Sequence, residues 1–177
     1  FSPDAQWAVH TYSSFTTPPV VALVHLPDHR VVRVLRDNRK LREKVAALKQ
    51  SAAEFLRVDI GGGIELDAWS LSPSASETPR PHPLLFHVYG EPASQSVRDA
   101  WGGKRGLWHW MLAQQGYRVV SVDNRGTAAP RGREWRKMIY RQIGILAAQE
   151  QAAAAKYAGE ADPYRHEDDD ETDGASA

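Results

Sequence analysis

Two predicted buried strands, the first of them nearly continuous in apolar or aromatic residues, flank a helical pattern in the middle of the chain, and this arrangement restricts the possible folds more than any other feature. The predicted strands are residues 84–89 and 117–123, and residues 105–115 between them carry apolar side chains at helical spacing. Gly116 stands where a left-handed residue ends a helix. A strand, a helix and a strand at this spacing predict a βαβ crossover, the unit of a parallel sheet covered on both faces.

The first half of the chain has the pattern of an antiparallel meander followed by a hairpin. Five short runs have the pattern of β-strands, with either alternating polar and apolar residues or mainly apolar ones. They are residues 7–12, 20–26, 31–35, 54–60 and 64–71. Residues 7–12 alternate as a half-buried strand does, and Gly61–Gly63 suit a hairpin loop. One amphipathic helix is expected over residues 39–50, with the side chain of Asp37 or Asn38 accepting a hydrogen bond from a free N–H of its first turn.

The last part of the chain is predicted to be helical and then unstructured. Helix formers dominate residues 135–157, with Gly144 as a break, and the Pro-rich stretch 72–83 predicts a surface connector. Between Gly159 and Gly174 there are eight acidic residues against one Arg. Such a segment buries too little apolar surface to offset the entropy of ordering, so residues 159–177 are predicted to form a disordered acidic tail.

Composition excludes several classes of protein. Lys plus Arg and Asp plus Glu both number 22, so the balance suggests neither nucleic acid nor an anionic membrane as a partner. The absence of cysteine excludes disulfides and a thiol nucleophile. No apolar run approaches the roughly 18 residues of a membrane span. The N-terminus lacks Met, and it has neither the basic nor the apolar region of a signal peptide, so we expect no signal peptide. We interpret the chain as an excerpt of a longer protein, whose relatives could be periplasmic or cytoplasmic.

A series of short motifs runs from Phe1 to about Tyr157. They are residues 1–4, 16–19, 34–38, 88–92, 101–103, 112–117, 122–126, 131–134 and 140–144. In this order and spacing they resemble the dipeptidyl peptidase IV branch of the prolyl oligopeptidase family of serine peptidases. The resemblance implies an α/β fold class: a partial α/β-hydrolase domain preceded by the last strands of a β-propeller.

The same resemblance divides the chain into three parts. Residues 1–36 look like the C-terminal strands of the propeller, and residues 37–158 look like the N-terminal part of the hydrolase, or peptidase, domain. Residues 159–177 are the acidic tail. The implied activity of a full-length relative is the release of dipeptides from peptide N-termini, often after Pro or Ala, with a peptide as substrate and no cofactor or metal.

Tyr89 is the one catalytic residue that the resemblance carries over. The family's Tyr-Gly-Gly-Pro loop supplies a phenol O–H to the oxyanion of the tetrahedral intermediate, and Tyr89 occupies that position in Val-Tyr-Gly-Glu-Pro. Glu91 departs from the family's Gly, and its carboxylate would repel the developing charge unless it points to solvent. The position just past a buried strand also places Tyr89 at the carboxyl edge of the sheet, where ligands bind in such folds.

The nucleophile of this family is not found in the 177 residues. Its elbow needs Gly-x-Ser-x-Gly between a buried strand and a helix, and the triad Asp and His follow the Ser. Gly174-Ala175-Ser176-Ala177 imitates four letters without a preceding strand, which we interpret as coincidence. We therefore expect the isolated fragment to be inactive, truncated before the elbow.

Two other functions remain open at this stage. A non-catalytic interaction fragment could dock a basic surface through its acidic tail, and a relative could have acylaminoacyl peptidase or oligopeptidase specificity. The incomplete sheet would also leave an open strand edge, which favours self-association.

Other polar and aromatic residues have ordinary structural interpretations beside functional ones. Arg125, after the second buried run, suits either a salt bridge or support of the site. The seven His residues show no metal-binding motif. Trp101, Trp108 and Trp110 are expected to pack in the core around Gly102-Gly103. A basic cluster could hold phosphate or pair with the acidic tail: Arg131, Arg133, Arg136 and Lys137.

Overall fold

The computed structural model describes residues 1–48, 53–73 and 82–160. The chain divides into two compact units. The first unit comprises residues 1–50 and 98–110, and the second comprises residues 51–97 and 111–177. The boundaries predicted from the resemblance, at residues 36 and 158, stay a prediction.

The first unit contains the predicted meander. Its three strands are β1 (Trp7–Tyr12), β2 (Val20–His25) and β3 (Arg30–Arg36), and they form an antiparallel sheet in the order β1-β2-β3. The expectation of a half-buried first strand is wrong, because all residues of β1 are exposed except the intermediate Ala8. Within the described residues β1 has one neighbouring strand and no helix packed over it, so alternation alone does not bury a face.

Helix α1 (Arg39–Ala46) follows the sheet. The Asp37 carboxylate accepts a hydrogen bond from the Arg39 backbone N–H at 3.0 Å, as predicted, but the N-cap residue is Asn38, whose side chain makes no capping hydrogen bond. The Asn38 side chain instead donates to the Pro19 carbonyl at 2.7 Å. The helix ends at Ala46, earlier than expected from the pattern, and residues 49–50 of the expected range lie outside the described residues.

The second unit is built on a four-stranded sheet. Its strands are β4 (Ala53–Asp59), β5 (Glu65–Leu71), β6 (Leu84–Phe86) and β7 (Arg118–Asp123), in the order β4-β5-β7-β6. The β4–β5 and β5–β7 pairs are antiparallel, and the β6–β7 pair is parallel. The predicted hairpin and the predicted βαβ crossover are both confirmed, with α2 (Gly103–Gln114) between β6 and β7.

The end of α2 follows the sequence prediction closely. Gly116 has φ +97°, and its N–H donates to the Ala113 carbonyl at 3.1 Å. The Tyr117 N–H donates to the Leu112 carbonyl, also at 3.1 Å. This pair of bonds is a Schellman motif, in which a left-handed Gly satisfies the last carbonyls of the helix and turns the chain toward the next strand.

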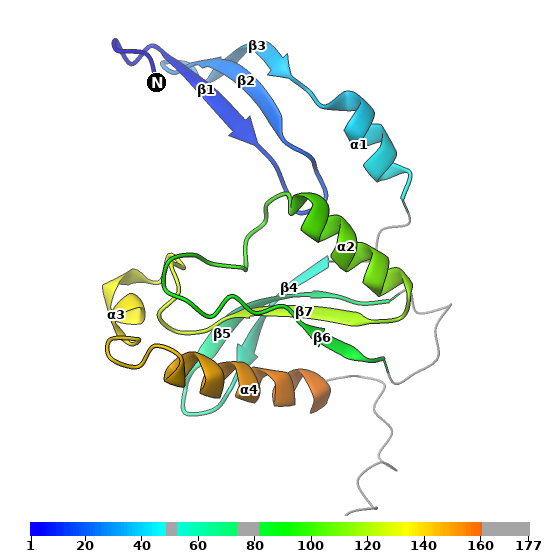
Figure 1. Cartoon of the computed structure of the whole chain (residues 1–177). Helices are drawn as coiled ribbons and strands as arrows, with labels where there is room; N and C mark the ends of the chain where they lie inside the picture. The colour runs from blue at the N-terminus through cyan, green and yellow to red at the C-terminus, as the bar shows by residue number, and fades with distance from the viewer. Residues whose placement is uncertain (49–52, 74–81, 161–177) are drawn as a thin grey trace, which may run out of the picture. The chain divides into compact units, whose positions relative to one another are not determined.

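The core of the second unit lies between the sheet and α4 (Ile145–Glu160), which runs along one face of the strands (Figure 1). Its buried members are Val58, Leu66, Ala68, Val120, Val122 and Ala154. Before α4 comes the short α3 (Gly132–Lys137), and Gly144, at φ +80°, separates α4 from the preceding turns, so the predicted break is confirmed.

The strand expected over residues 84–89 is shorter and less buried than its sequence indicates. β6 ends at Phe86, and Leu84 is exposed. Within the described residues β6 pairs only with β7, so it is an edge strand and lacks the second neighbour that would bury it. Self-association through this edge stays a prediction.

Two predicted segments lie mainly outside the described residues: most of the connector at 72–83 and the acidic tail at 159–177. No helix in the part of the chain that the structure describes combines the length and hydrophobicity needed to cross a bilayer.

Candidate active site

Tyr89 lies three residues beyond the end of β6, and 45% of its surface is exposed. Because β6 and β7 are parallel, their carboxyl ends lie at the same edge of the sheet. The turn that follows Asp123, the last residue of β7, therefore shares this edge with Tyr89. The structure thus places the predicted site residue at the sheet edge where ligands bind in α/β folds, with its side chain accessible.

The chain turns immediately after Tyr89. Gly90 has φ +78°, a conformation that L-residues rarely adopt. A Cβ placed on Gly90 would lie 3.7 Å from the Cβ of Ala147, so this turn lies against the first turn of α4. The side chain of Glu91 is exposed, which is the condition under which its charge is screened by water.

The segment from His87 to Val97 is fastened to β7 at both ends. At its start, the His87 N–H donates to the Val120 carbonyl at 2.8 Å, and the Ser121 hydroxyl donates to the His87 carbonyl at 2.7 Å. At its end, the backbone N–H groups of Ser96 and Val97 donate to the Asp123 carboxylate. We call residues 87–97 the Tyr89 loop.

Arg125 forms an ion pair with Glu150 of α4. The Arg125 guanidinium and the Arg125 backbone N–H, the latter at 2.8 Å, both donate to the Glu150 carboxylate. Glu150 is only 3% exposed. Of the two interpretations open from sequence, this arrangement favours the structural ion pair, which fixes the turn after β7 to α4.

Gly126 completes this turn because no larger residue fits. Its φ is +93°, and a Cβ there would lie 2.6 Å from the Cβ of Ile139. The Gly126 N–H donates to the Trp135 carbonyl at 3.0 Å. The turn at the sheet edge is therefore held by α4 and by α3.

Comparison with known proteins supports the resemblance. The sequence profile of the prolyl oligopeptidase family matches residues 108–177. A probable dipeptidyl peptidase 4 of Emericella nidulans is 30% identical over 165 residues, covering 92% of this chain. The crystal structure of Porphyromonas gingivalis dipeptidyl peptidase 4 is 38% identical, covers 90% of this chain and superposes with a TM-score of 0.82.

These matches support a dipeptidyl peptidase IV-like member of the prolyl oligopeptidase family. An acylaminoacyl peptidase of Pyrococcus horikoshii, 20% identical over 89% of this chain with a TM-score of 0.66, shares the fold. The chain spans about a fifth of these relatives: 21% of the Emericella protein, 22% of the Porphyromonas protein and 23% of the Pyrococcus protein.

Arg131, which was singled out from the sequence, has structural partners. The Arg131 guanidinium lies 4.0 Å from the centre of the Trp135 ring and 3.8 Å from the Asp67 carboxylate, so it is engaged within the second unit. Among the described residues, no group of three or more His, Asp or Glu could hold a metal ion.

The Trp residues follow the expected packing only in part. Trp101 and Trp110 pack edge to face, with ring centres 5.9 Å apart, whereas Trp108 is half-exposed.

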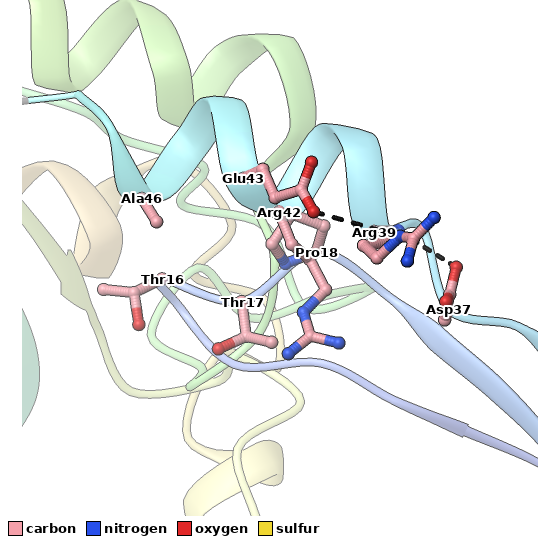
Figure 2. Close-up of a pocket in the computed structure, with 8 residues that line it drawn as sticks. All are labelled: Thr16, Thr17, Pro18, Asp37, Arg39, Arg42, Glu43 and Ala46. Atoms are coloured by element: carbon pink, nitrogen blue, oxygen red, sulfur yellow. Dashed lines mark hydrogen bonds and ion pairs between the residues drawn. The ribbon is translucent and has the colours of Figure 1, made fainter.

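A separate concavity of about 580 Å³ lies in the first unit. Figure 2 shows that α1 and the segments before β2 and after β3 line it, and that Arg39 contacts both Asp37 and Glu43. The lining residues are Thr16, Thr17, Pro18, Asp37, Arg39, Arg42, Glu43 and Ala46. None of them was selected from sequence as catalytic.

Three polar residues that hold the edge at which Tyr89 lies were not predicted from the sequence: Ser121, Asp123 and Glu150. One signal was available for two of them. Ser121 and Asp123 alternate with the valines of β7 at a spacing of two, which places both on one face of the strand. Glu150 gave no such signal, because its partner lies 25 residues away.

Proposed function

We propose that this chain is the part of a dipeptidyl peptidase IV-like serine exopeptidase that supplies the oxyanion-stabilising tyrosine, Tyr89. The enzyme would release dipeptides from peptide N-termini, often after Pro or Ala. The observation that carries the proposal is the accessible position of Tyr89 at the carboxyl edge of the parallel β6–β7 pair. The 38% identity to a dipeptidyl peptidase 4 supports this choice of substrate class.

The chemistry follows from the phenol group. During acyl transfer the substrate carbonyl oxygen gains negative charge, and an O–H donor aimed at that oxygen stabilises the transition state more than the ground state. Loss of one such donor typically costs about 10²- to 10³-fold in turnover. The left-handed Gly90 and the exposed Glu91 leave no bulky or buried charged side chain directly after Tyr89 in the sequence.

The architecture that we propose has two parts. The antiparallel β1-β2-β3 meander supports assignment of residues 1–36 to the last strands of a propeller. The order β4-β5-β7-β6, with one parallel pair and a βαβ crossover, supports assignment of residues 37–158 to the N-terminal part of an α/β-hydrolase domain.

The proposal includes inactivity of these 177 residues alone. They contain no Gly-x-Ser-x-Gly, so Tyr89 has no attacking hydroxyl to assist. We expect the purified chain to hydrolyse no Gly-Pro-p-nitroanilide and to resist labelling by a fluorophosphonate. Labelling at any Ser would overturn this part of the proposal.

A chimera tests the function itself. Residues 1–157 replace the corresponding segment of the Porphyromonas gingivalis dipeptidyl peptidase 4, and hydrolysis of Gly-Pro-p-nitroanilide is measured beside hydrolysis of an N-acetylated amino-acid anilide. The expected result is hydrolysis of the dipeptide substrate that depends on Tyr89. A folded chimera without activity, or one that prefers the acylated substrate, would contradict the proposal.

A further inference from the structure

The face of β7 opposite α4 carries two buried polar side chains, Ser121 and Asp123. The apolar core on the other face uses Val120 and Val122. Ser121 is fully buried and Asp123 is 1% exposed. A carboxylate this deeply buried carries a large desolvation cost unless hydrogen bonds compensate it. The partners of Asp123 therefore indicate what the residue is for.

Each oxygen of the Asp123 carboxylate accepts one backbone hydrogen bond from the end of the Tyr89 loop. The Ser96 N–H lies 2.7 Å from Oδ1, and the Val97 N–H lies 3.0 Å from Oδ2. Hydrogen bonds to a charged acceptor are about twice as strong as neutral ones. Asp123 thus holds two successive peptide groups in one orientation.

Further contacts close the same loop over the sheet. The Trp69 indole N–H donates to the Ser96 carbonyl at 3.1 Å, and the Trp69 ring stacks on the His87 ring at 6.3 Å between centres. The Ser121 hydroxyl donates to the His87 carbonyl. Trp69 and Ser121 are register partners on β5 and β7. The two ends of the loop are therefore attached to neighbouring positions on the sheet.

We infer that Asp123 is a positioning residue for Tyr89. It fastens the far end of the Tyr89 loop to β7, while Ser121 fastens the near end, so that Tyr89 projects from a closed loop of fixed span. The inference rests on the proposed function only for its consequence in catalysis. The positioning itself is a property of the 177-residue chain and can be tested there.

The test uses the near-isosteric Asp123→Asn. The amide keeps one acceptor oxygen but faces the second N–H with its own NH₂, so one of the two hydrogen bonds is lost. We expect amide hydrogen exchange at Ser96 and Val97 to rise roughly ten- to a hundredfold, with exchange at His87 unchanged. 3-Fluorotyrosine at position 89 should show a shifted ¹⁹F resonance, whereas the same label at Tyr157 should not.

A matched control separates positioning from general loss of stability. The exposed Asp59 carboxylate accepts the Gly61 N–H at 2.8 Å in the β4–β5 turn, so Asp59→Asn makes the same chemical change at a carboxylate that also accepts a backbone hydrogen bond elsewhere in the unit. It should leave the ¹⁹F resonance at position 89 unchanged. If Asp123→Asn does not fold, Val97→Pro deletes one donor and keeps the charge, and the same resonance should move.

Unchanged exchange at Ser96 and Val97 together with an unchanged resonance at position 89, in a folded variant, would overturn the inference. In the active chimera, Asp123→Asn should lower kcat on the order of 10- to 100-fold with little change in KM, because a donor displaced by about 1 Å loses most of its effect. An inactive parent chimera would count against the proposed function, while the exchange and ¹⁹F results would still decide the positioning role.

Discussion

Strands β3 and β7 have similar compositions and opposite surroundings. β3 reads Arg-Val-Val-Arg-Val-Leu-Arg and all seven residues are exposed, whereas β7 reads Arg-Val-Val-Ser-Val-Asp and its last five residues are buried. β7 pairs with two strands, and its Val120 and Val122 pack in the core that includes Ala154 of α4. Within the described residues, β3 pairs with β2 alone. Valine content therefore predicts a strand, and the number of packed neighbours decides whether the strand is buried.

The largest difference in stability between variants of the two units should come from breaking an ion pair in each. Glu150→Ala leaves the Arg125 guanidinium largely buried without its partner, so we expect a loss of about 3–5 kcal/mol in the free energy of unfolding. Glu43→Ala in the first unit breaks an exposed pair with Arg39 at 3.9 Å and should cost less than about 1 kcal/mol. Urea unfolding measures both, and equal losses would contradict the contrast.

Leucine truncations compare the two sheets directly. Leu71 of β5 is fully buried, and Leu71→Ala should cost about 2–5 kcal/mol through lost burial and a residual cavity. Leu35 of β3 is 50% exposed, and Leu35→Ala should change stability by no more than about 0.5 kcal/mol. The urea midpoints of the two variants provide the check, and a large effect at Leu35 would show that β3 is buried in solution.

Glycine substitutions extend the contrast to the turns. Gly126→Ala combines a left-handed backbone with a Cβ only 2.6 Å from the Cβ of Ile139, for an expected cost of about 2–4 kcal/mol. Gly103 of the first unit has φ +60° and open space where a Cβ would lie. Gly103→Ala should therefore lower the free energy of unfolding only by the cost of a left-handed backbone at Ala, about 1–2 kcal/mol. Similar unfolding free energies for the two variants would rule out the close contact at Gly126.

The smallest expected effect concerns pH in the first unit. The His25 ring, 2.7 Å from the Asp28 carboxylate, is the main cause that lowers the pKa of Asp28 below its ordinary value of 3.8. A carboxyl whose pKa is lower in the folded chain contributes stability above about 3.8, and that contribution is lost as the pH falls through the lowered pKa. Because the Asp28 side chain is exposed to solvent, the change in stability should be small.

Carboxyl NMR titration measures this effect residue by residue. His25→Ala should move the pKa of Asp28 back toward 3.8, since the hydrogen bond that favours the charged form is gone. An unchanged titration of Asp28 in that variant would show that the His25 contact does not form in solution.

Local patterns were sufficient to predict most of the secondary structure. Alternation and apolar runs located the strands, and the Gly116 signal located the end of α2 because a Schellman turn depends on residues close in sequence. Burial was not predictable in the same way. Residues 7–12 alternate correctly yet stay exposed, because burial depends on elements distant in the chain.

Of the candidate site, the sequence predicted Tyr89 but not the residues that hold its loop. Tyr89 was predicted from its motif, and it lies just beyond β6 at the carboxyl edge of the β6–β7 pair. The contacts that hold its loop join Asp123 to residues 26 and 27 positions away, and no local pattern encodes such a pairing. A buried Asp and Ser two residues apart in an apolar strand were the one available signal.

The central claim is that the Tyr89 hydroxyl stabilises an oxyanion, and kcat of Tyr89→Phe in the chimera tests it most directly. The substitution removes one oxygen atom and keeps the ring. We predict that kcat for Gly-Pro-p-nitroanilide falls about 10²- to 10³-fold with little change in KM, while Tyr140→Phe, at a highly exposed tyrosine, leaves kcat unaltered. A Tyr89→Phe chimera that keeps the parent kcat would contradict the claim.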